Sequence, residues 1–290
     1  MWFALSLLSA VSKSASQILT KKLHALGTLE LAAYSHIFSA VLILPLFFFV
    51  EIPLTGAFLY PTACSTVMNV VAILLLIQAI KISDLSYSIP FLSLTPVFVI
   101  LVAFVFRGEV MSPLSASGIF LIVLGAFVID ARSLPDLARF GGARIFKDKG
   151  VLLVLSVALI YSVSSVCDKS ATLASSPLAY VWLFTLARAA IFGLLLFLSR
   201  LKHGAKKSPA FERRNLLVLI FIGLIYFLEA SFQMQAFEYG NVAEIIGVKR
   251  VSILFTSLSG FMIFKESFTR YKLIGAMLLV LGAVVIYVFR

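Results

Sequence analysis

Charged residues are scarce in this chain: Asp, Glu, Lys and Arg make up 13% of its 290 residues, whereas 61% are hydrophobic. A soluble domain contains about 25% charged and about 45–50% apolar residues. This composition therefore excludes an ordinary soluble protein, and also a disordered or collagen-like chain. It argues equally against an outer-membrane β-barrel, whose alternating strands are only weakly hydrophobic.

Cysteine and histidine are nearly missing, with two and three copies. Cys64 and Cys167 lie in apolar stretches, and two such thiols form neither a disulfide framework nor a metal site. The sequence also has no His-Glu-x-x-His, no aspartate-rich diphosphate motif and no P-loop. We therefore expect no metal, no cofactor and no enzyme activity. A membrane-embedded enzyme acting on a lipid-linked or small polar substrate stays open as an alternative, as does a channel or scaffold.

Long apolar segments dominate the rest of the sequence. A membrane helix needs about 20 apolar residues, and ten such segments are present. Because lipid offers the backbone no hydrogen-bond partners, each segment is predicted to be a helix. The expected fold is thus an all-α polytopic protein with ten transmembrane helices, in the cell (inner) membrane. The segments are Trp2–Thr20, Leu31–Val50, Gly56–Ile80, Leu85–Phe106, Leu114–Ile129, Gly150–Cys167, Leu178–Leu198, Asn215–Phe237, Val242–Phe264 and Tyr271–Phe289.

Basic residues outnumber acidic ones by 24 to 13, for a net charge of +11. In a membrane protein this excess is typical of cytoplasmic loops, so we expect a lipid bilayer and no nucleic acid as partner. The loops that follow the first, third, fifth, seventh and ninth segments, counted with Lys272 at the start of the tenth segment, hold 17 of the 24 Lys and Arg residues, most of them in Ala131–Lys149 and Ser199–Arg214. The positive-inside rule places these loops in the cytoplasm and both termini outside.

An internal repeat divides the chain. Ala79–Ile129 aligns without a gap on Ala236–Ile286, with 14 identities in 51 positions and eight in the last twelve. We therefore predict a first unit at 1–131, a basic linker at 132–149 and a second unit at 150–290. Five helices in each unit force the second to enter the membrane upside down. Inverted repeats are a hallmark of secondary transporters.

Ionisable side chains inside the predicted segments are costly, since Lys, Arg or Asp costs about 2.5–3.5 kcal/mol at a helix centre, and six of them are candidates. Such residues are functional candidates by default, and the alternative is mutual pairing, with Glu229 or Glu244 neutralising a cation. The six are Lys13, Arg188, Glu229, Glu244, Lys249 and Arg250.

The ninth segment is the most unusual because Lys249 and Arg250 are adjacent. Neighbouring residues of a helix point about 100° apart, so we expect both to border a polar cavity. Gly247 lies just before them and aligns with Pro90, and paired helix-weakening residues point to a midplane binding site. Arg suits bidentate capture of carboxylate or phosphate, and Lys supplies a compact charge. The pair therefore favours an anionic or phosphorylated substrate.

Three further sets of residues, some uncharged polar side chains, four glycines and two glutamates, are predicted to assist binding or to stabilise the fold. Uncharged side chains could add hydrogen bonds to a substrate, although polar residues also hold helices together. The glycines spaced seven apart in each half predict close helix packing, and an aligned glutamate precedes each pair as a helix-start charge or loop acceptor. The uncharged candidates are Gln78, Gln235, Tyr87, Asn69, Gln17 and Gln233; the glycines are Gly118, Gly125, Gly275 and Gly282; the glutamates are Glu109 and Glu266.

These motifs resemble the EamA-type unit of the drug/metabolite transporter superfamily. The resemblance implies ten helices in two inverted five-helix repeats, and secondary transport of a small polar metabolite by alternating access through a central cavity. Coupling to an ion or proton, the substrate and the direction of transport stay open. The matching residues are Gln78-Ala79, Leu94-Thr95-Pro96, Gly108-Glu109, Gly118 and Leu-Gly-Ala at 124–126, then Lys265-Glu266, Gly275 and Leu-Gly-Ala at 281–283.

The sequence departs from this pattern in two places, Lys265 and Ile253, where the first half has Gly108 and Pro96. Val248-Lys249-Arg250-Val251 further resembles the ninth-helix pair of plastid sugar-phosphate translocators, in which Lys and Arg hold the phosphate. Relatives are generally thought to have cytoplasmic termini, which conflicts with the charge count. We give the charge count more weight.

Overall fold

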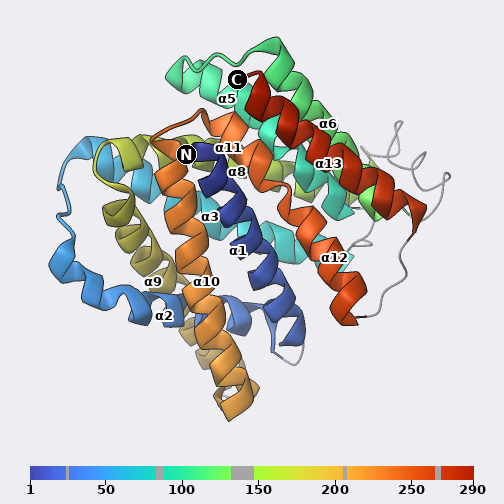
Figure 1. The fold of residues 1–290 in the computed structure, drawn as a ribbon. Coiled ribbons are helices and arrows are strands. Elements are labelled where there is room, and N and C mark those ends of the chain that lie inside the picture. The colour runs from blue at the N-terminus through green and yellow to red at the C-terminus, as the bar shows by residue number, and fades with distance from the viewer. Residues whose placement is uncertain (24–25, 83–87, 132–146, 205–207, 265–268) are drawn as a thin grey trace.

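The computed structural model describes the whole chain except residues 24–25, 83–87, 132–146, 205–207 and 265–268. The described residues form ten successive helical segments, as predicted (Figure 1). Three of these segments consist of two helical elements each, and a short 3-10 turn, η4 (Pro209–Phe211), precedes the eighth. The ten are α1 (Trp2–Lys22); α2 (Thr28–Ile43) with η1 (Leu44–Phe49); α3 (Gly56–Ile82); η2 (Ile89–Leu94) with α5 (Thr95–Arg107); α6 (Pro113–Asp130); α8 (Lys149–Leu173); α9 (Pro177–His203); α10 (Arg213–Phe237); α11 (Val242–Lys249) with α12 (Ser252–Phe264); and α13 (Arg270–Val288).

Seven helices in the described ranges are long and apolar enough to cross a membrane. Large apolar side chains such as Phe104, Phe197 and Phe221 are more than half exposed on the outside of the bundle, where lipid would cover them. The sixth segment is longer than its hydropathy indicates, because α8 continues past Cys167 to Leu173. The chain is therefore a multi-pass integral membrane protein.

Helix packing is symmetric under exchange of the two halves. α1 packs on α10, and its counterpart α8 packs on α3; α2 packs on its own counterpart α9. Likewise η2 and α5 pack on α8, while α11 and α12 pack on α1. The same contacts thus recur with the halves interchanged, which supports the prediction of two related five-helix units.

The symmetry centres on the crossing of α6 and α13, which lie side by side (Figure 1). A Cβ atom added to Gly282 would lie 2.5 Å from the carbonyl oxygen of Gly118, and one added to Gly125 would lie 2.8 Å from that of Gly275. These paired contacts run in opposite directions along the two helices, so α6 and α13 are antiparallel. The glycines therefore permit close backbone approach, as predicted, and the crossing fits an inverted repeat.

Substitution of Gly282 by Ala tests this crossing. The new Cβ meets backbone rather than a flexible side chain, so we expect a loss of at least about 2 kcal/mol in stability. Gly193→Ala in α9 is the matched control, because the nearest atom to its added Cβ is 3.8 Å away. Thermal unfolding in detergent should show a large drop in melting temperature for the first variant and little change for the second. Equal melting temperatures would contradict the close crossing.

The fourth and ninth segments are discontinuous at equivalent places. α5 begins at Thr95 and α12 begins at Ser252, which the repeat aligns. Pro90 lies in η2, before the first of these starts. Gly247 lies within α11, and the helical run is interrupted three residues later, at Arg250 and Val251. The glycine instead packs against α6 and α13, because an added Cβ would meet Ile119 at 3.2 Å.

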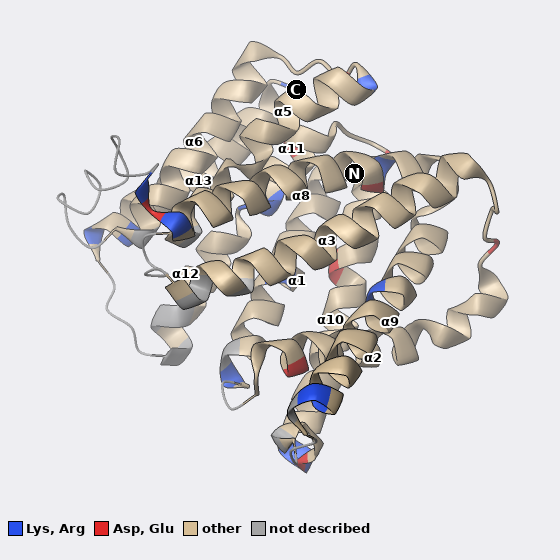
Figure 2. Cartoon of the chain, turned by 180° about the vertical axis from the view of Figure 1, so that it is seen from behind, with Lys and Arg blue, Asp and Glu red and all other residues tan. Residues whose placement is uncertain are grey.

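The termini lie together at one end of the bundle, beside the start of α1 and the end of α13 (Figure 1). Lys22 in α1, Arg213 in α10 and Arg270 in α13, which begin or end basic connections, lie at the end of each helix that is farther from the chain termini. Figure 2 marks Lys and Arg in blue at helix ends on that side. The charge asymmetry of the sequence is thus an asymmetry between the two faces of the bundle.

Candidate functional site

A cavity of about 1150 Å³ lies between the two halves. Both repeats contribute to its lining, from α1, α2 and α3 through η2 and α5 to α8, α9, α10, α11 and α12. The lining also includes Thr20, Thr28, Ala131 and Thr269, at helix ends on the side away from the termini. The cavity therefore extends toward the face that carries the basic connections.

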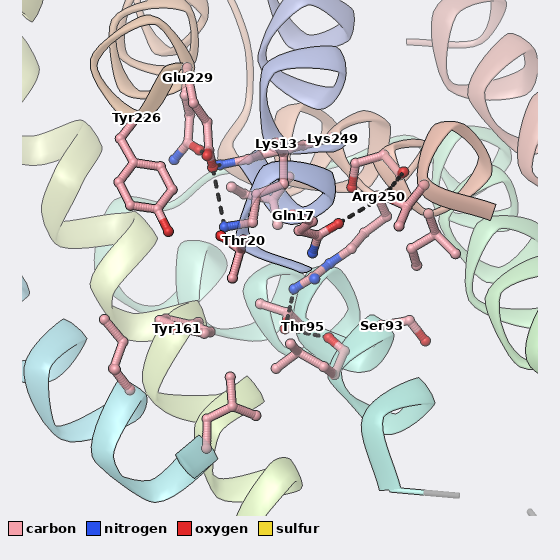
Figure 3. Close-up of a pocket in the computed structure, with 18 of the residues that line it drawn as sticks. Lys13, Gln17, Thr20, Ser93, Thr95, Tyr161, Tyr226, Glu229, Lys249 and Arg250 are labelled. Carbon is pink, nitrogen blue, oxygen red and sulfur yellow. Dashed lines mark hydrogen bonds and ion pairs between the residues drawn. The ribbon is translucent and has the colours of Figure 1, made fainter. Parts of the chain in front are cut away.

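Three charged side chains meet on one wall of the cavity (Figure 3). The Lys249 Nζ lies 2.7 Å from the Glu229 Oε1, and the Lys13 Nζ lies 3.6 Å from the same oxygen. Lys249 also donates a hydrogen bond to the Gln233 Oε1. Glu229 thus both lines the cavity and pairs with cations, which are the two roles that the sequence offered for it. Its carboxylate is shared by Lys13 and Lys249.

Arg250 follows directly after the end of α11 and points from the interruption into the same cavity (Figure 3). Its Nη2 donates to the Thr95 Oγ1 over 2.7 Å, which joins the two helix discontinuities. Its Nε is buried and has no hydrogen-bond partner among the described residues. Part of the guanidinium fork is therefore free.

Arg188 in α9 supplies a fourth cation. Its guanidinium carbon lies 4.3 Å from the centre of the Phe184 ring, and its buried Nε has no partner within the described ranges. The structure gives it no carboxylate within 4 Å in the part of the chain that it describes. The Phe184 ring stabilises the cation through a cation–π contact, and the Nε donor stays available among the described residues.

Side chains that are neutral hydrogen-bond donors also line the cavity. Tyr161 and Tyr226 line the cavity across from Lys13 and Arg250 (Figure 3). His36 also lines it, stacked on Phe192 with ring centres 5.2 Å apart. These groups can donate hydrogen bonds without adding charge.

The sequence analysis missed Asp168, since it placed the end of the sixth segment at Cys167. Asp168 lies inside α8, is buried and lines the same cavity. Its Oδ1 accepts hydrogen bonds from Ser65 and from the Tyr180 hydroxyl, the latter over 2.5 Å. The hydropathy pattern ended the predicted helix before this carboxyl group. In the structure its hydrogen-bond partners offset the free-energy cost of burying it, so the helix continues.

Electrostatics of the cavity favour an anion. Five Lys and Arg side chains line it, from Lys13, Arg188, Lys249, Arg250 and Lys272, against the carboxyl groups of Glu229 and Asp168. Even with both acids ionised, the described lining keeps a positive excess. In a site walled by protein, such an excess attracts and orients negative charge.

The predicted site residues divide into three groups. The first group lines the cavity and consists of Lys13, Asn69, Arg188, Glu229, Lys249, Arg250 and Pro90, together with Gln17 and Gln233. Gln78 and Gln235 are exposed and do not line it, and Glu244 pairs with Arg290 at 3.0 Å, near the termini. Tyr87, Lys265 and Glu266 lie outside the described residues.

A second ionic cluster, the Glu109 cluster, joins the two halves at the end of the bundle that holds the termini. The Glu109 carboxylate accepts from the Lys169 Nζ at 2.6 Å, from the Arg107 Nε at 2.9 Å and from the backbone N–H of Val242 at 2.9 Å. Val242 is the first residue of α11, so Glu109 is a helix-start charge as predicted, for a helix of the other half. Lys169 also donates to the Gly240 carbonyl at 2.8 Å. The cluster closes this end of the bundle.

Glu109 lies in the loop between α5 and α6, and the cluster depends on its negative charge. Protonating Glu109 should therefore weaken the cluster that closes this end of the bundle. Burial raises the pKa of Glu109, but hydrogen bonds from Lys169, Val242 and Arg107 outweigh it, so the pKa lies below the ordinary value of 4.5. A lowered carboxyl pKa stabilises the fold above the ordinary value, and that contribution is lost as pH falls through the folded value. We expect Glu109→Gln to cost about 3 kcal/mol at neutral pH, because Lys169 is left nearly buried and unpaired.

Thermal unfolding across a pH series would measure this effect. The gap between wild type and Glu109→Gln should narrow as pH falls below 4.5. Glu30→Gln is the control, because the Glu30 to Arg200 pair at 3.0 Å is more exposed and should matter little. A pH-independent gap would show that the charge of Glu109 does not hold the cluster together.

Comparison with known proteins agrees with this architecture. The EamA-like transporter family matches residues 1–130 and again residues 148–288, nearly the whole chain. The chain belongs to the EamA-like transporter family. It is therefore a membrane transporter of the drug/metabolite superfamily and not an enzyme, so the membrane-enzyme alternative is set aside.

Structural similarity supports the same fold. One solved crystal structure of a protein with 17% sequence identity superposes with a TM-score of 0.78, covering 98% of this chain and 95% of that one. No curated protein matches this EamA-like transporter in sequence.

Proposed function

We propose that this transporter carries a small metabolite with an anionic group, and that the group binds at Lys249, Arg250 and Arg188. The observation that carries the proposal is the positive excess in the cavity, together with the unpartnered Nε atoms of Arg188 and Arg250. A guanidinium with free donors suits carboxylate and phosphate oxygens. Tyr161 and Tyr226 would add neutral hydrogen bonds to the rest of the molecule.

Transport would proceed by alternating access through this cavity. The Glu109 cluster holds the two halves together at the end near the termini, while the cavity extends to the other face. Exchanging the conformations of two inverted repeats gives a state open to the opposite side. The charge count supports a cytoplasmic position for the face with the basic connections, whereas relatives of this family favour the reverse.

Matched pairs of small molecules test the substrate class. Glycerol 3-phosphate against glycerol, and lactate against propane-1,2-diol, differ mainly in the anionic group. We expect the anionic member of at least one pair to raise the melting temperature of the purified protein, and to undergo counterflow in proteoliposomes. Equal stabilisation by the neutral and anionic members would overturn the anionic class.

A further inference from the structure

Asp168 differs from four other carboxyl groups of the bundle in having no cation beside it within the described residues. Within the described residues, Glu30, Glu109, Glu229 and Glu244 each lie within 4 Å of a Lys or Arg nitrogen, at 3.0, 2.6, 2.7 and 3.0 Å respectively. Asp168 is 6% exposed and has no such partner in the part of the chain that the structure describes. Each of those four carboxylates has a cation beside it, whereas Asp168 has none among the described residues.

The surroundings of Asp168 suit either protonation state. Its Oδ1 accepts from the hydroxyls of Ser65 and Tyr180, and the Ser65 hydroxyl lies 2.9 Å from that of Ser164. Asn69 donates to the Ser164 Oγ at 2.6 Å. A hydroxyl both donates and accepts, and its proton rotates. The same network can therefore donate to a carboxylate or accept from a carboxylic acid without moving its heavy atoms.

The charges that act on Asp168 belong to the proposed substrate site. Arg188 from α9 and Lys249 from α11 line the same cavity as Asp168, and positive charges in the same cavity favour a carboxylate over a carboxylic acid. Tyr180 from α9 contacts it, Ser65 and Asn69 face it from α3, and Cys167 is its neighbour in α8. An anion bound to Arg188 and Lys249 would screen these cations from Asp168. Anion binding and protonation of Asp168 should thus promote each other.

We propose that Asp168 binds one proton together with the anionic substrate and releases it with the substrate, which makes the protein a proton–anion symporter. On the loading side a hydronium ion gives up the proton, so its O–H bond breaks as an O–H bond to the Asp168 carboxylate forms. On the other side, after the anion leaves, the Asp168 O–H bond breaks and the proton passes to water. This inference rests on the proposed function, because the anion supplies the coupling. The ionisable groups of the site thereby have distinct roles: the cations hold the substrate, and Asp168 carries the proton.

Infrared titration of the reconstituted protein tests the proton site without any substrate. Between about pH 8 and about pH 4, above the ordinary Asp pKa of about 3.9, the carbonyl stretch of a buried protonated carboxyl should appear in wild type. Asp168→Asn should remove this band, while Glu229→Gln and His36→Gln keep it. Ser65→Ala removes one donor to the carboxylate and should move the midpoint of the band to higher pH. A band that survives in Asp168→Asn, or that is absent from wild type, would overturn the proposal.

Sulfate tests the coupling, because it is an anion that does not buffer near neutral pH. Adding it to unbuffered wild-type protein should cause proton uptake, and its affinity should rise as pH falls, by up to about tenfold per pH unit for one linked proton. Asp168→Asn should bind sulfate with a pH-independent affinity and take up no proton. Failure of sulfate to stabilise either protein would count against the proposed function, whereas sulfate binding without proton uptake in wild type would refute the coupling alone.

Discussion

Arg250→Lys is expected to weaken binding of the anionic probe by about ten- to a hundredfold while the protein stays folded, since a charged hydrogen bond is worth roughly 1.5–3 kcal/mol. The substitution keeps the positive charge but removes the planar fork, whose Nη2 bonds Thr95 and whose Nε is free. Titration calorimetry or a thermal-shift titration with the stabilising anion would measure the change.

Lys249→Gln should weaken binding further, because it removes a charge as well as a donor. The appropriate control for both variants is Arg200→Lys. Arg200 bonds Glu30 and the Tyr34 hydroxyl outside the cavity, so its replacement should leave anion affinity unchanged. Unchanged affinity in Arg250→Lys, with the control behaving as expected, would mean that Arg250 only links the two helix discontinuities.

The fold was predictable because its determinants are local and repeated. Apolar length alone gives ten helices, and the alignment of Gly118 with Gly275 and of Gly125 with Gly282 identifies the four glycines of the crossing of α6 and α13. At that crossing Gly118 meets Gly282 and Gly125 meets Gly275. The positions of the helix discontinuities were harder to predict from the sequence. Gly247 marks the correct helix, but the space it leaves is used for packing on Ile119, and the interruption falls on Arg250.

The site was predictable where charge is costly in lipid and unpredictable where partners remove that cost. Lys249 and Arg250 stand out because no apolar helix tolerates two adjacent cations without a polar neighbour. Asp168 was missed because it follows an apolar run and its partners, Ser65 and Tyr180, are distant in sequence. The aligned Gln78 and Gln235 were misleading as candidates for the cavity: alignment between repeats gives equivalent positions, and these equivalent positions are exposed.

Glu229→Gln should lower the stability of the ligand-free protein and strengthen anion binding, with larger opposing changes than the other variants. Its carboxylate lies 2.7 Å from the Lys249 Nζ and 3.6 Å from the Lys13 Nζ, and its own side chain is only 10% exposed. Removing one partner of a buried pair costs about 3–5 kcal/mol in a dry interior, and the cavity and the exposed Lys13 reduce this to about 2 kcal/mol here. The melting temperature without ligand should therefore fall.

Anion binding should move the other way in the same variant. With Glu229 neutral, Lys13 and Lys249 have no carboxylate partner among the described residues, so the anion becomes their counter-ion and its stabilising effect should grow. The double variant Glu229→Gln/Lys249→Gln separates the two roles of Lys249. If the lysine only pairs with Glu229, the double variant should regain stability and keep full anion affinity and transport. If the lysine binds substrate, stability should recover in part while anion affinity stays below that of wild type, because the balance of charge is restored but the donor is gone.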